Sequence, residues 1–436
     1  MPLDSYENFA SLVEPDRVHK ACYADEKVFE AELENIFYKS WIYVGHESQV
    51  PNPGDYWTTW IGKERVIFCR AEDGKVHVLF NRCAHRGALL CNNQHGNVAK
   101  AFRCPYHAWQ YNMDGSLRNV PLKKGYEGII ELNDPQLQLQ RPARQETYRG
   151  FVFASLAEQG PSLDEWMGQG ARSAFDDICN RSPEGECEIV MNCFRIIQHS
   201  NWKIFLENQL DAVHPSVTHH STGDAAAQEQ KIYKEKTGED PPIGYQFLAD
   251  FTLPIEKWDQ FYTVGHPFGH TVLSGYMDLR PKDPVTVAHE DALTKAYGKE
   301  RMDEILSTNV HHVLVYPCLS VQPPLQQLRA IRPLAANKTL TEIWHFRLKG
   351  APEGVYDRSL QYYYHVNSPS TMVNADDLNN FRACQDGLEL DGGGDWVSLH
   401  RNYGQDPVKD GITTSVGGMS EQPMRNMMAA WKEYMS

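Results

Sequence analysis

Two short stretches in the first third of the chain each place a thiol close to an imidazole. They read Cys83-Ala-His85 and Cys104-Pro-Tyr-His107. Two thiolates and two imidazoles could hold a tetrahedral structural Zn²⁺. Zinc sites usually group Cys with Cys and His with His, however, whereas a [2Fe-2S] cluster of mixed ligation takes two thiolates on one iron and two imidazoles on the other. One thiolate and one imidazole in each loop therefore favour the cluster over zinc.

A second set of candidate ligands lies in residues 201–219. On a helix, Asp211 and His214 would be one turn apart and face the same way. Pro215 disfavours helical geometry at His214, so the helix should end there, and a loop could return His219 to its side. Two histidines and one carboxylate on one face of a metal leave positions open for O2 and substrate, as in non-haem Fe(II) oxygenases. The sequence thus predicts a second, mononuclear metal site.

The segments around these ligands resemble the catalytic α subunit of Rieske non-haem iron aromatic-ring-hydroxylating dioxygenases. CAHRGALLC and CPYHAWQYNMDG resemble the cluster loops, and ENQLDAVHPSVTH resembles the E-N-x-x-D-x-x-H-x4-H segment of that family. DDLNNFRACQDGL is most similar to the benzoate, anthranilate and aniline branch. The likeness runs from WIYVGHESQVPNPGDY to the terminal helix, and so covers nearly the whole chain.

The resemblance implies a role for each candidate ligand. It implies that the [2Fe-2S] cluster is held by Cys83, His85, Cys104 and His107, and the mononuclear Fe(II) by His214, His219 and a downstream aspartate. Asp377 fits the family's D-x7-Q-x-G-L pattern, and Asp376 is the alternative. Asp211 matches the catalytic carboxylate that, in this family, links a ligand histidine to a cluster histidine of the neighbouring subunit.

The elements that must position these ligands change character along the chain. Residues 40–155 hold short β-branched and aromatic segments between turn signals, so we expect a small all-β domain around the cluster. Residues 1–39, with helical spacing over 23–39, and residues 156–436 should form one larger α+β domain for the mononuclear iron, with the β domain inserted near its N-terminus. The resemblance implies that the antiparallel sheet of this larger domain curves around a helix, as in helix-grip folds.

Several elements of the larger domain can be predicted from the sequence. Residues 200–214 indicate a helix capped by Ser200 or Asn201. Residues 311–322, 326–334 and 341–350 indicate successive strands of one antiparallel sheet, and residues 370–388 indicate the last helix. The polar run 222–245 is expected to be a mobile excursion.

Composition limits the class of protein. With 436 residues and 41% hydrophobic content, the chain can form two or three domains with cores, which excludes disordered and fibrous classes. No apolar run approaches the roughly 18 to 20 residues that span a bilayer, and the acidic start lacks the features of a signal peptide. We therefore expect a cytoplasmic protein without a membrane or nucleic-acid partner, in which most of the 10 cysteines are reduced packing residues.

Charge around the predicted cluster opposes the net charge of −15. Against Asp114 alone, residues 81–126 hold seven basic residues: Arg82, Arg86, Lys100, Arg103, Arg118, Lys123 and Lys124. Such a face would attract an acidic electron donor. The resemblance implies a ferredoxin or reductase donor fed by NADH, and a trimer of α subunits usually accompanied by small β subunits (α3β3, with α3 as the alternative).

The resemblance implies a terminal oxygenase that uses O2 to cis-dihydroxylate an aromatic carboxylate, arylamine or related arene. Rieske monooxygenases and O- or N-demethylases use the same metals and are the alternative, and an electron carrier or zinc-binding protein is a remote one. A carboxylated substrate would require a bidentate arginine. The candidates are Arg329, Arg332, Arg347 and Arg401, and Phe205, Leu206 and Met372 are candidate apolar walls.

Overall fold

The computed structural model describes residues 8–190, 193–276 and 283–436. The chain divides into two compact units, Phe37–Leu163 and the combination of Met1–Ile36 with Asp164–Ser436. The smaller unit continues beyond the expected residue 155 because the following segment stays hydrogen-bonded to it. The indole N–H of Trp41 donates to the carbonyl of Pro161 at 3.1 Å, and the Arg144 guanidinium donates to the carbonyls of Ala157 and Pro161.

The smaller unit is built from three antiparallel sheets, with strand orders β6-β5-β4-β7, β10-β9-β8 and β11-β12-β3. The strands are β3 (Ile42–His46), β4 (Asp55–Ile61), β5 (Glu64–Arg70), β6 (Val76–Phe80), β7 (His95–Asn97), β8 (Phe102–Arg103), β9 (Gln110–Tyr111), β10 (Leu117–Asn119), β11 (Arg144–Tyr148) and β12 (Phe151–Ser155). Cys83 and Cys104 belong to its buried core together with Trp109 and Tyr111. The cluster loops are therefore anchored in the interior of this unit.

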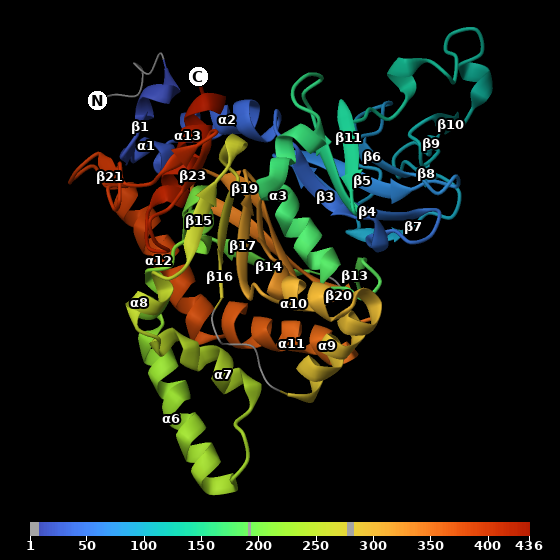
Figure 1. Ribbon diagram of the computed structural model, residues 1–436. Helices are drawn as coiled ribbons and strands as arrows, with labels where there is room; N and C mark the ends of the chain where they lie inside the picture. The colour runs from blue at the N-terminus through green and yellow to red at the C-terminus, as the bar shows by residue number, and fades with distance from the viewer. Residues whose placement is uncertain (1–7, 191–192, 277–282) are drawn as a thin grey trace. The chain divides into compact units, whose positions relative to one another are not determined.

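The larger unit contains a ten-stranded sheet in the order β13-β20-β19-β18-β17-β16-β15-β23-β22, with β14 also paired to β20 (Figure 1). All its pairings are antiparallel. The strands are β13 (Cys187–Ile189), β14 (Phe194–Gln198), β15 (Tyr262–Gly265), β16 (Thr271–Gly275), β17 (Val310–Val315), β18 (Leu319–Gln322), β19 (Gln327–Ala335), β20 (Lys338–Leu348), β22 (Val408–Lys409) and β23 (Ile412–Thr414). A small sheet joins β1 (Val13–Glu14), β2 (Arg17–His19) and β21 (Trp396–Ser398). The α+β class and the antiparallel succession predicted from the sequence are confirmed, except that the single strand expected over 311–322 is two strands, β17 and β18, separated by a turn at residues 316–318.

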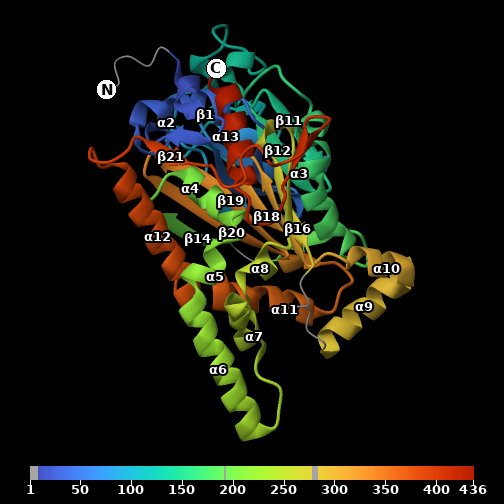
Figure 2. The same cartoon turned by 60° about the vertical axis from the view of Figure 1, so that its left-hand side comes forward.

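Helices contact the large sheet at several strands: α4 lies against β17 and β19, α11 against β20, α12 against β14 and α13 against β15 and β16. Figure 2 shows α4, α5 and α12 together beside the sheet. The helices are α1 (Ala21–Ala24), α2 (Glu26–Glu32), α3 (Leu163–Asn180), α4 (Trp202–Gln209), α5 (His214–Thr218), α6 (His220–Thr237), α7 (Ile243–Ala249), α8 (Ile255–Trp258), α9 (Pro284–Tyr297), α10 (Lys299–Ile305), α11 (Glu353–Tyr362), α12 (Met372–Leu388) and α13 (Gln422–Tyr434). Over the described parts of the chain, none of them combines the length and the apolar run needed to cross a bilayer.

Three local predictions were wrong. The helix expected over 200–214 ends at Gln209, and Pro215 instead lies in the first turn of α5, where its missing N–H costs nothing. Residues 222–245 lie largely in α6 and α7, which pack along each other (Figure 1), because the run is rich in the helix formers Ala, Gln, Glu and Lys. Helix α12 covers the predicted 370–388 segment but is followed by α13.

Candidate metal centres

The two cluster loops share one backbone pattern. In each loop the cysteine N–H donates to the carbonyl five residues on, and the N–H four residues on donates back to the cysteine carbonyl. These distances are 2.9 and 2.9 Å around Cys83, and 2.8 and 3.0 Å around Cys104. The residues four positions on, Gly87 and Ala108, both have positive φ, 71° and 56°, which glycine adopts freely and alanine only under strain. The loops are thus two copies of one turn that presents a thiol and an imidazole.

The four predicted cluster ligands converge within the smaller unit. The rings of His85 and His107 meet edge to face with centroids 4.7 Å apart. The thiols of Cys83 and Cys104 are buried, and the sulfur atoms interact with each other. Nδ1 of each histidine is buried and has no hydrogen-bond partner among the described residues. Two thiols and two imidazoles whose Nδ1 atoms have no partner are the donor set that a Rieske [2Fe-2S] cluster requires, so these residues fit the cluster.

Neighbouring aromatic side chains hold two of these ligands in place. The indole of Trp109 stacks on His85 at 4.8 Å and 4°. The Tyr111 hydroxyl lies 3.2 Å from the sulfur of Cys83 and accepts the N–H of Ala84 at 3.1 Å. Burial raises the pKa of the Cys83 thiol, so iron must displace a proton that the protein alone retains. Burial, with His107 and Arg86 nearby, lowers the pKa of His85, which favours the neutral form that binds metal.

The surface around the first loop is basic. All seven basic side chains predicted for this face are exposed: Arg82, Arg86, Lys100, Arg103, Arg118, Lys123 and Lys124. A groove beside Cys83 and His85 adds Lys63 and Arg65, with Glu64 as its one acidic residue. Lys63 and Arg65 lie on the β4–β5 hairpin, far enough from the motif in sequence that the count over 81–126 missed them.

Three predicted ligands of the mononuclear site converge in the larger unit. His214 begins α5, His219 lies between α5 and α6, and Asp377 lies on α12. Nε2 of His219 is 3.2 Å from Oδ1 of Asp377, and Nε2 of His214 is 3.8 Å from the same oxygen. One ligand atom from each residue lies within 4.8 Å of the others. Two imidazoles and one carboxylate on one face match the donor set of a non-haem Fe(II) site, so these residues fit the iron.

A carboxylate oxygen lies near Nδ1 of each of these histidines. Oδ2 of Asp211 lies 3.6 Å from Nδ1 of His214, and Oδ2 of Asp376 lies 3.6 Å from Nδ1 of His219. Burial alone would raise the pKa of Asp211, but the interaction with His214 and the N–H of Val213 outweigh it, and the net pKa is lowered. At 3.6 Å neither carboxylate hydrogen-bonds its histidine, and Nδ1 of both rings is buried without a hydrogen-bond partner among the described residues. Asp376 therefore lies outside the ligand group, and Asp377 lies inside it.

Two amide side chains fix this arrangement. Asn208 donates from Nδ2 to Nε2 of His214 at 3.0 Å and to Oδ1 of Asp377 at 3.4 Å. Gln385, the glutamine of the D-x7-Q spacing, accepts the N–H of Asn201 at 2.8 Å, and Asn201 caps α4. The Gln385 contact ties α12 to the start of α4 and so sets which side of α12 faces the histidines. His220 is exposed and pairs with Asp224 at 3.4 Å, away from this group.

A cavity of about 130 Å³ adjoins the three ligands. Of the four candidate arginines, only Arg329 lines it. Arg332 pairs with Glu342 at 3.2 Å, and Arg347 and Arg401 are paired with Glu353 and Glu421. Arg329 donates instead to the neutral amides of Gln209 at 2.5 Å and Gln322 at 3.1 Å, and its Nε has no partner within the described chain.

Arg329 is a buried cation whose hydrogen bonds go to neutral amides, although Asp377 of the same pocket interacts with it electrostatically. Its side chain is 6% exposed, and burial lowers its pKa to about 10, so it stays protonated at neutral pH. Burial also lowers the pKa of its neighbour His312 to about 4, which keeps that imidazole neutral. A buried charge without an opposite partner is costly. Arg329 forms no salt bridge with the described residues, so its guanidinium offers a site for an anion in a pocket that Asp211 and Asp377 also line.

The predicted apolar walls lie elsewhere. Phe205 and Leu206 are buried in the core of the unit, and Met372 is 62% exposed, so none of the three lines the cavity. The lining includes residues that sequence reasoning missed: Gln209, Phe251, Trp258, His312, Gln322 and Tyr362. Only Gln209 lies within a recognised motif, and the others come from elements whose distance from the site is set by the tertiary fold.

Residues 40–135 match the Rieske [2Fe-2S] domain, and residues 187–436 match the ring hydroxylating alpha subunit (catalytic domain). Toluate 1,2-dioxygenase subunit alpha of Pseudomonas putida is 33% identical over 396 residues, which cover 88% of this chain and 82% of that protein. Anthranilate 1,2-dioxygenase large subunit of Acinetobacter baylyi is 31% identical over 394 residues, covering 89% and 81%. Naphthalene 1,2-dioxygenase with indole bound has the same fold, with a TM-score of 0.81 and 24% identity over 99% of this chain and 94% of that one.

Proposed function

Since this chain belongs to the family of ring-hydroxylating alpha subunits, which are oxidoreductases, we propose that it cis-dihydroxylates an aromatic carboxylate with O2 at an Fe(II) held by His214, His219 and Asp377. The observation that supports this assignment most directly is the convergence of the three ligand atoms beside a cavity. Cys83, His85, Cys104 and His107 would hold the Rieske cluster. When bound, the cluster supplies single electrons and the Fe(II) supplies open positions for O2.

The chain's own residues would prepare and protect the iron pocket. Asp211 and Asp376 lie 3.6 Å from Nδ1 of the two ligand imidazoles, where their negative charge would favour a proton on that nitrogen and leave Nε2 for the metal. Asn208 contacts both a ligand nitrogen and a ligand oxygen, and so spaces them before metal enters. Phe251, Trp258 and other apolar side chains line the cavity, where they exclude water and pack against an aromatic ring.

Asp211 would have a second role between subunits. In this family the matching carboxylate links a ligand histidine to a cluster histidine of the adjacent subunit, and Asp211 lies beside His214 as that role requires. We infer an α3β3 assembly, with α3 as the alternative, in which a single subunit is poorly active. Asp211→Asn should leave both metals bound while coupled turnover is lost, and undiminished product formation would refute the linking role.

The electron donor would be a ferredoxin or reductase supplied by NADH. The exposed basic side chains around the cluster loops favour an acidic partner, because opposite charges accelerate encounter. Reduction of the cluster by its donor should therefore slow steeply as salt is added. A rate that stays flat from low to high ionic strength would exclude this docking mode.

The substrate assignment rests on Arg329 and on the substrates named for the relatives. Toluate and anthranilate are aromatic carboxylates. Arg329 is the one candidate arginine that lines the pocket, and it forms no ion pair with the described residues there, although Asp377 interacts with it electrostatically. A carboxylate on the ring would supply the missing anion and point the ring toward the ligand group.

The assignment can be tested with benzoate and its neutral isostere nitrobenzene. Arg329→Gln should raise KM for benzoate by about a hundredfold, the scale of a lost charge-assisted contact, while nitrobenzene is turned over as before. Arg329→Lys should give a KM for benzoate between those of the parent and Arg329→Gln, since lysine keeps the charge but cannot make the bidentate contact. Arg347→Gln, which removes an arginine outside the pocket, is the control. Equal losses for both substrates would assign Arg329 to the integrity of the site instead.

The reaction type needs a separate measurement. With ¹⁸O2, a dioxygenase places two labelled atoms in each product molecule, whereas a Rieske monooxygenase or demethylase places one. A product with a single labelled atom would replace the dioxygenase proposal with the monooxygenase alternative.

A further inference from the structure

A second and larger cavity adjoins the iron pocket. It has a volume of about 260 Å³, against about 130 Å³ for the iron pocket. The two share five lining residues: Phe251, Trp258, Val310, His312 and Tyr362. A cavity on the order of 150 Å³ accommodates one benzene ring. The iron pocket is thus the size of a single ring, and the second cavity, here called the side chamber, has room for a sizeable substituent on that ring.

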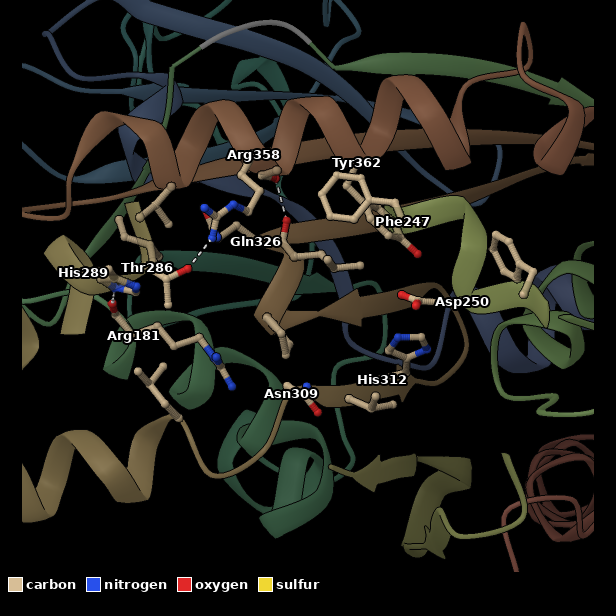
Figure 3. A pocket seen from close by; sticks show the side chains of 18 of the residues that line it. Arg181, Phe247, Asp250, Thr286, His289, Asn309, His312, Gln326, Arg358 and Tyr362 are labelled. Carbon is tan, nitrogen blue, oxygen red and sulfur yellow. Dashed lines mark hydrogen bonds between the residues drawn. The ribbon is translucent and has the colours of Figure 1, made fainter. Parts of the chain in front are cut away.

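Most charged groups around the side chamber are already paired. Arg181 forms an ion pair with Asp177 at 2.8 Å, and Arg358 forms one with Asp283 at 2.5 Å. Arg358 also donates to the Thr286 hydroxyl (Figure 3). These contacts satisfy the two cations within the protein, so neither guanidinium needs a ligand.

Asp250 is the exception. Its carboxyl points into the side chamber (Figure 3) and has no hydrogen bond or ion pair to any residue that the structure describes. It follows directly on α7 and begins the short 3-10 helix Asp250–Thr252. Burial raises its pKa to about 7. A ligand that brings a hydrogen-bond donor would therefore stabilise this unpartnered carboxyl.

We propose that the side chamber binds a substituent of the substrate that ends in an N–H or O–H donor, and that Asp250 accepts this hydrogen bond. The inference rests on the proposed function, because the substituent is placed by a ring in the iron pocket. Arg329 would recognise the carboxylate in that pocket, and Asp250 the far end of the substituent. The substrate class is then a benzoate that carries a donor-terminated side chain, larger than plain benzoate or toluate.

Matched substituents of nearly equal size test the hydrogen bond. The probes are the 3- and 4-isomers of hydroxymethylbenzoate and aminomethylbenzoate, with ethylbenzoate as the analogue that has no donor. Binding to the iron-loaded holoenzyme is measured by calorimetric titration, and KM and kcat are measured separately. We expect at least one donor probe to bind about tenfold or more tightly than its ethyl isomer, since a site built around a buried polar group rejects the analogue that leaves it unpaired. The aminomethyl and hydroxymethyl probes distinguish a cationic donor from a neutral one, and preference for either supports the proposal.

Two substitutions at Asp250 show where the preference comes from. Asp250→Leu keeps the approximate shape of the side chain. It should weaken binding of the donor probes to the affinity of ethylbenzoate, while the affinity for ethylbenzoate itself is unchanged. Asp250→Asn retains an acceptor oxygen and should keep part of the preference. Glu256→Gln removes an exposed acidic group nearby on α8 and should change nothing. Melting temperatures of the variants check their folding.

The outcomes separate this inference from the proposed function. Turnover of plain benzoate with labelled O2 tests the function without any use of Asp250. If benzoate is dihydroxylated but no donor probe is preferred in either isomer, or the preference persists in Asp250→Leu, the role of Asp250 is overturned while the function stands. If benzoate is not turned over, the proposed function is overturned, and the inference about Asp250 falls with it because it rests on that function.

Discussion

The cluster loops and the mononuclear site present similar ligand types through different architectures. The cluster ligands lie in two short loops of the smaller unit, and each loop closes by the same pair of backbone hydrogen bonds. The mononuclear ligands come from the α5–α6 region and from α12. Asn208 and Asp377 are 169 residues apart in sequence and 3.4 Å apart in space. A site built from local turns is fixed by its own backbone, whereas a site built across the fold depends on packing far from the ligands.

The sharpest test of this difference is the loss of one ligand from the site built across the fold. Asp377→Asn should remove the mononuclear iron and reduce product formation to background, because one of only three protein ligands is lost. The visible spectrum of the cluster should be unchanged. Asp386→Asn, a change of the same kind on the exposed side of α12, is the control. Full iron content in Asp377→Asn would exclude Asp377 as a ligand.

The converse test removes a ligand from one loop. Cys104→Ser should abolish the visible absorption of the cluster and stop electron-dependent turnover, while iron analysis still finds the mononuclear site filled. Cys91→Ser changes a buried thiol of the same core that stands outside the ligand set and should keep the spectrum. Loss of both metals in Cys104→Ser would show that the two sites do not form independently.

A smaller effect is expected from the carboxylate behind His219. Asp376→Asn removes the negative charge 3.6 Å from Nδ1 without touching a ligand atom. Iron affinity should fall about 10- to 100-fold, the usual cost of losing such a partner, as measured by competition with a chelator. Unchanged affinity would mean that Gln385 and the packing of α12 orient the site without help from Asp376.

The smallest expected effect is on stability and concerns Glu207 of α4. Glu207 is partly buried, and its carboxylate accepts the Tyr23 hydroxyl at 2.7 Å; loss of solvation raises its pKa from 4.5 to about 7. Between these pH values the folded protein holds a proton that the unfolded chain has released, so the free energy of unfolding declines as pH rises through this window. Glu207→Gln should flatten that decline and be more stable than the parent above pH 7 by about 1–3 kcal/mol.

Denaturant unfolding at several pH values would measure this effect. Asp250 also has a raised pKa and contributes a change of the same sign, so the informative quantity is the difference between Glu207→Gln and the parent protein. A parallel decline in both proteins would assign the pH dependence to other groups. No aspartate or glutamate is buried among the described residues of the smaller unit, so the slope reports on the larger unit.

Short sequence patterns predicted the helices and strands that carry the candidate ligands. They failed where contacts between distant segments determine whether a helix begins or ends. The cap at Asn201, the strand that carries Arg329 and the helix that carries Asp377 were all predicted from spacing and residue type. Pro215 was expected to end a helix, but it begins one, because a proline fits the first turn of α5 as well as it disfavours the residue before it. Short-range rules allow both outcomes, and long-range contacts select between them.

The sequence by itself determined the fold class, the family and the identity of the candidate ligands, because these depend on residue types at fixed short spacings. The tertiary structure favours Asp377 over Asp376 as the proposed ligand, since neighbouring residues on a helix point about 100° apart and Oδ1 of Asp377 lies near Nε2 of both histidines. The tertiary structure also separates the four candidate arginines. Arg329 lines the cavity, whereas the other three form ion pairs with glutamates that the folded chain brings beside them. The side chamber and Asp250 have no sequence signal, since a cavity is formed by segments that meet only in the folded chain.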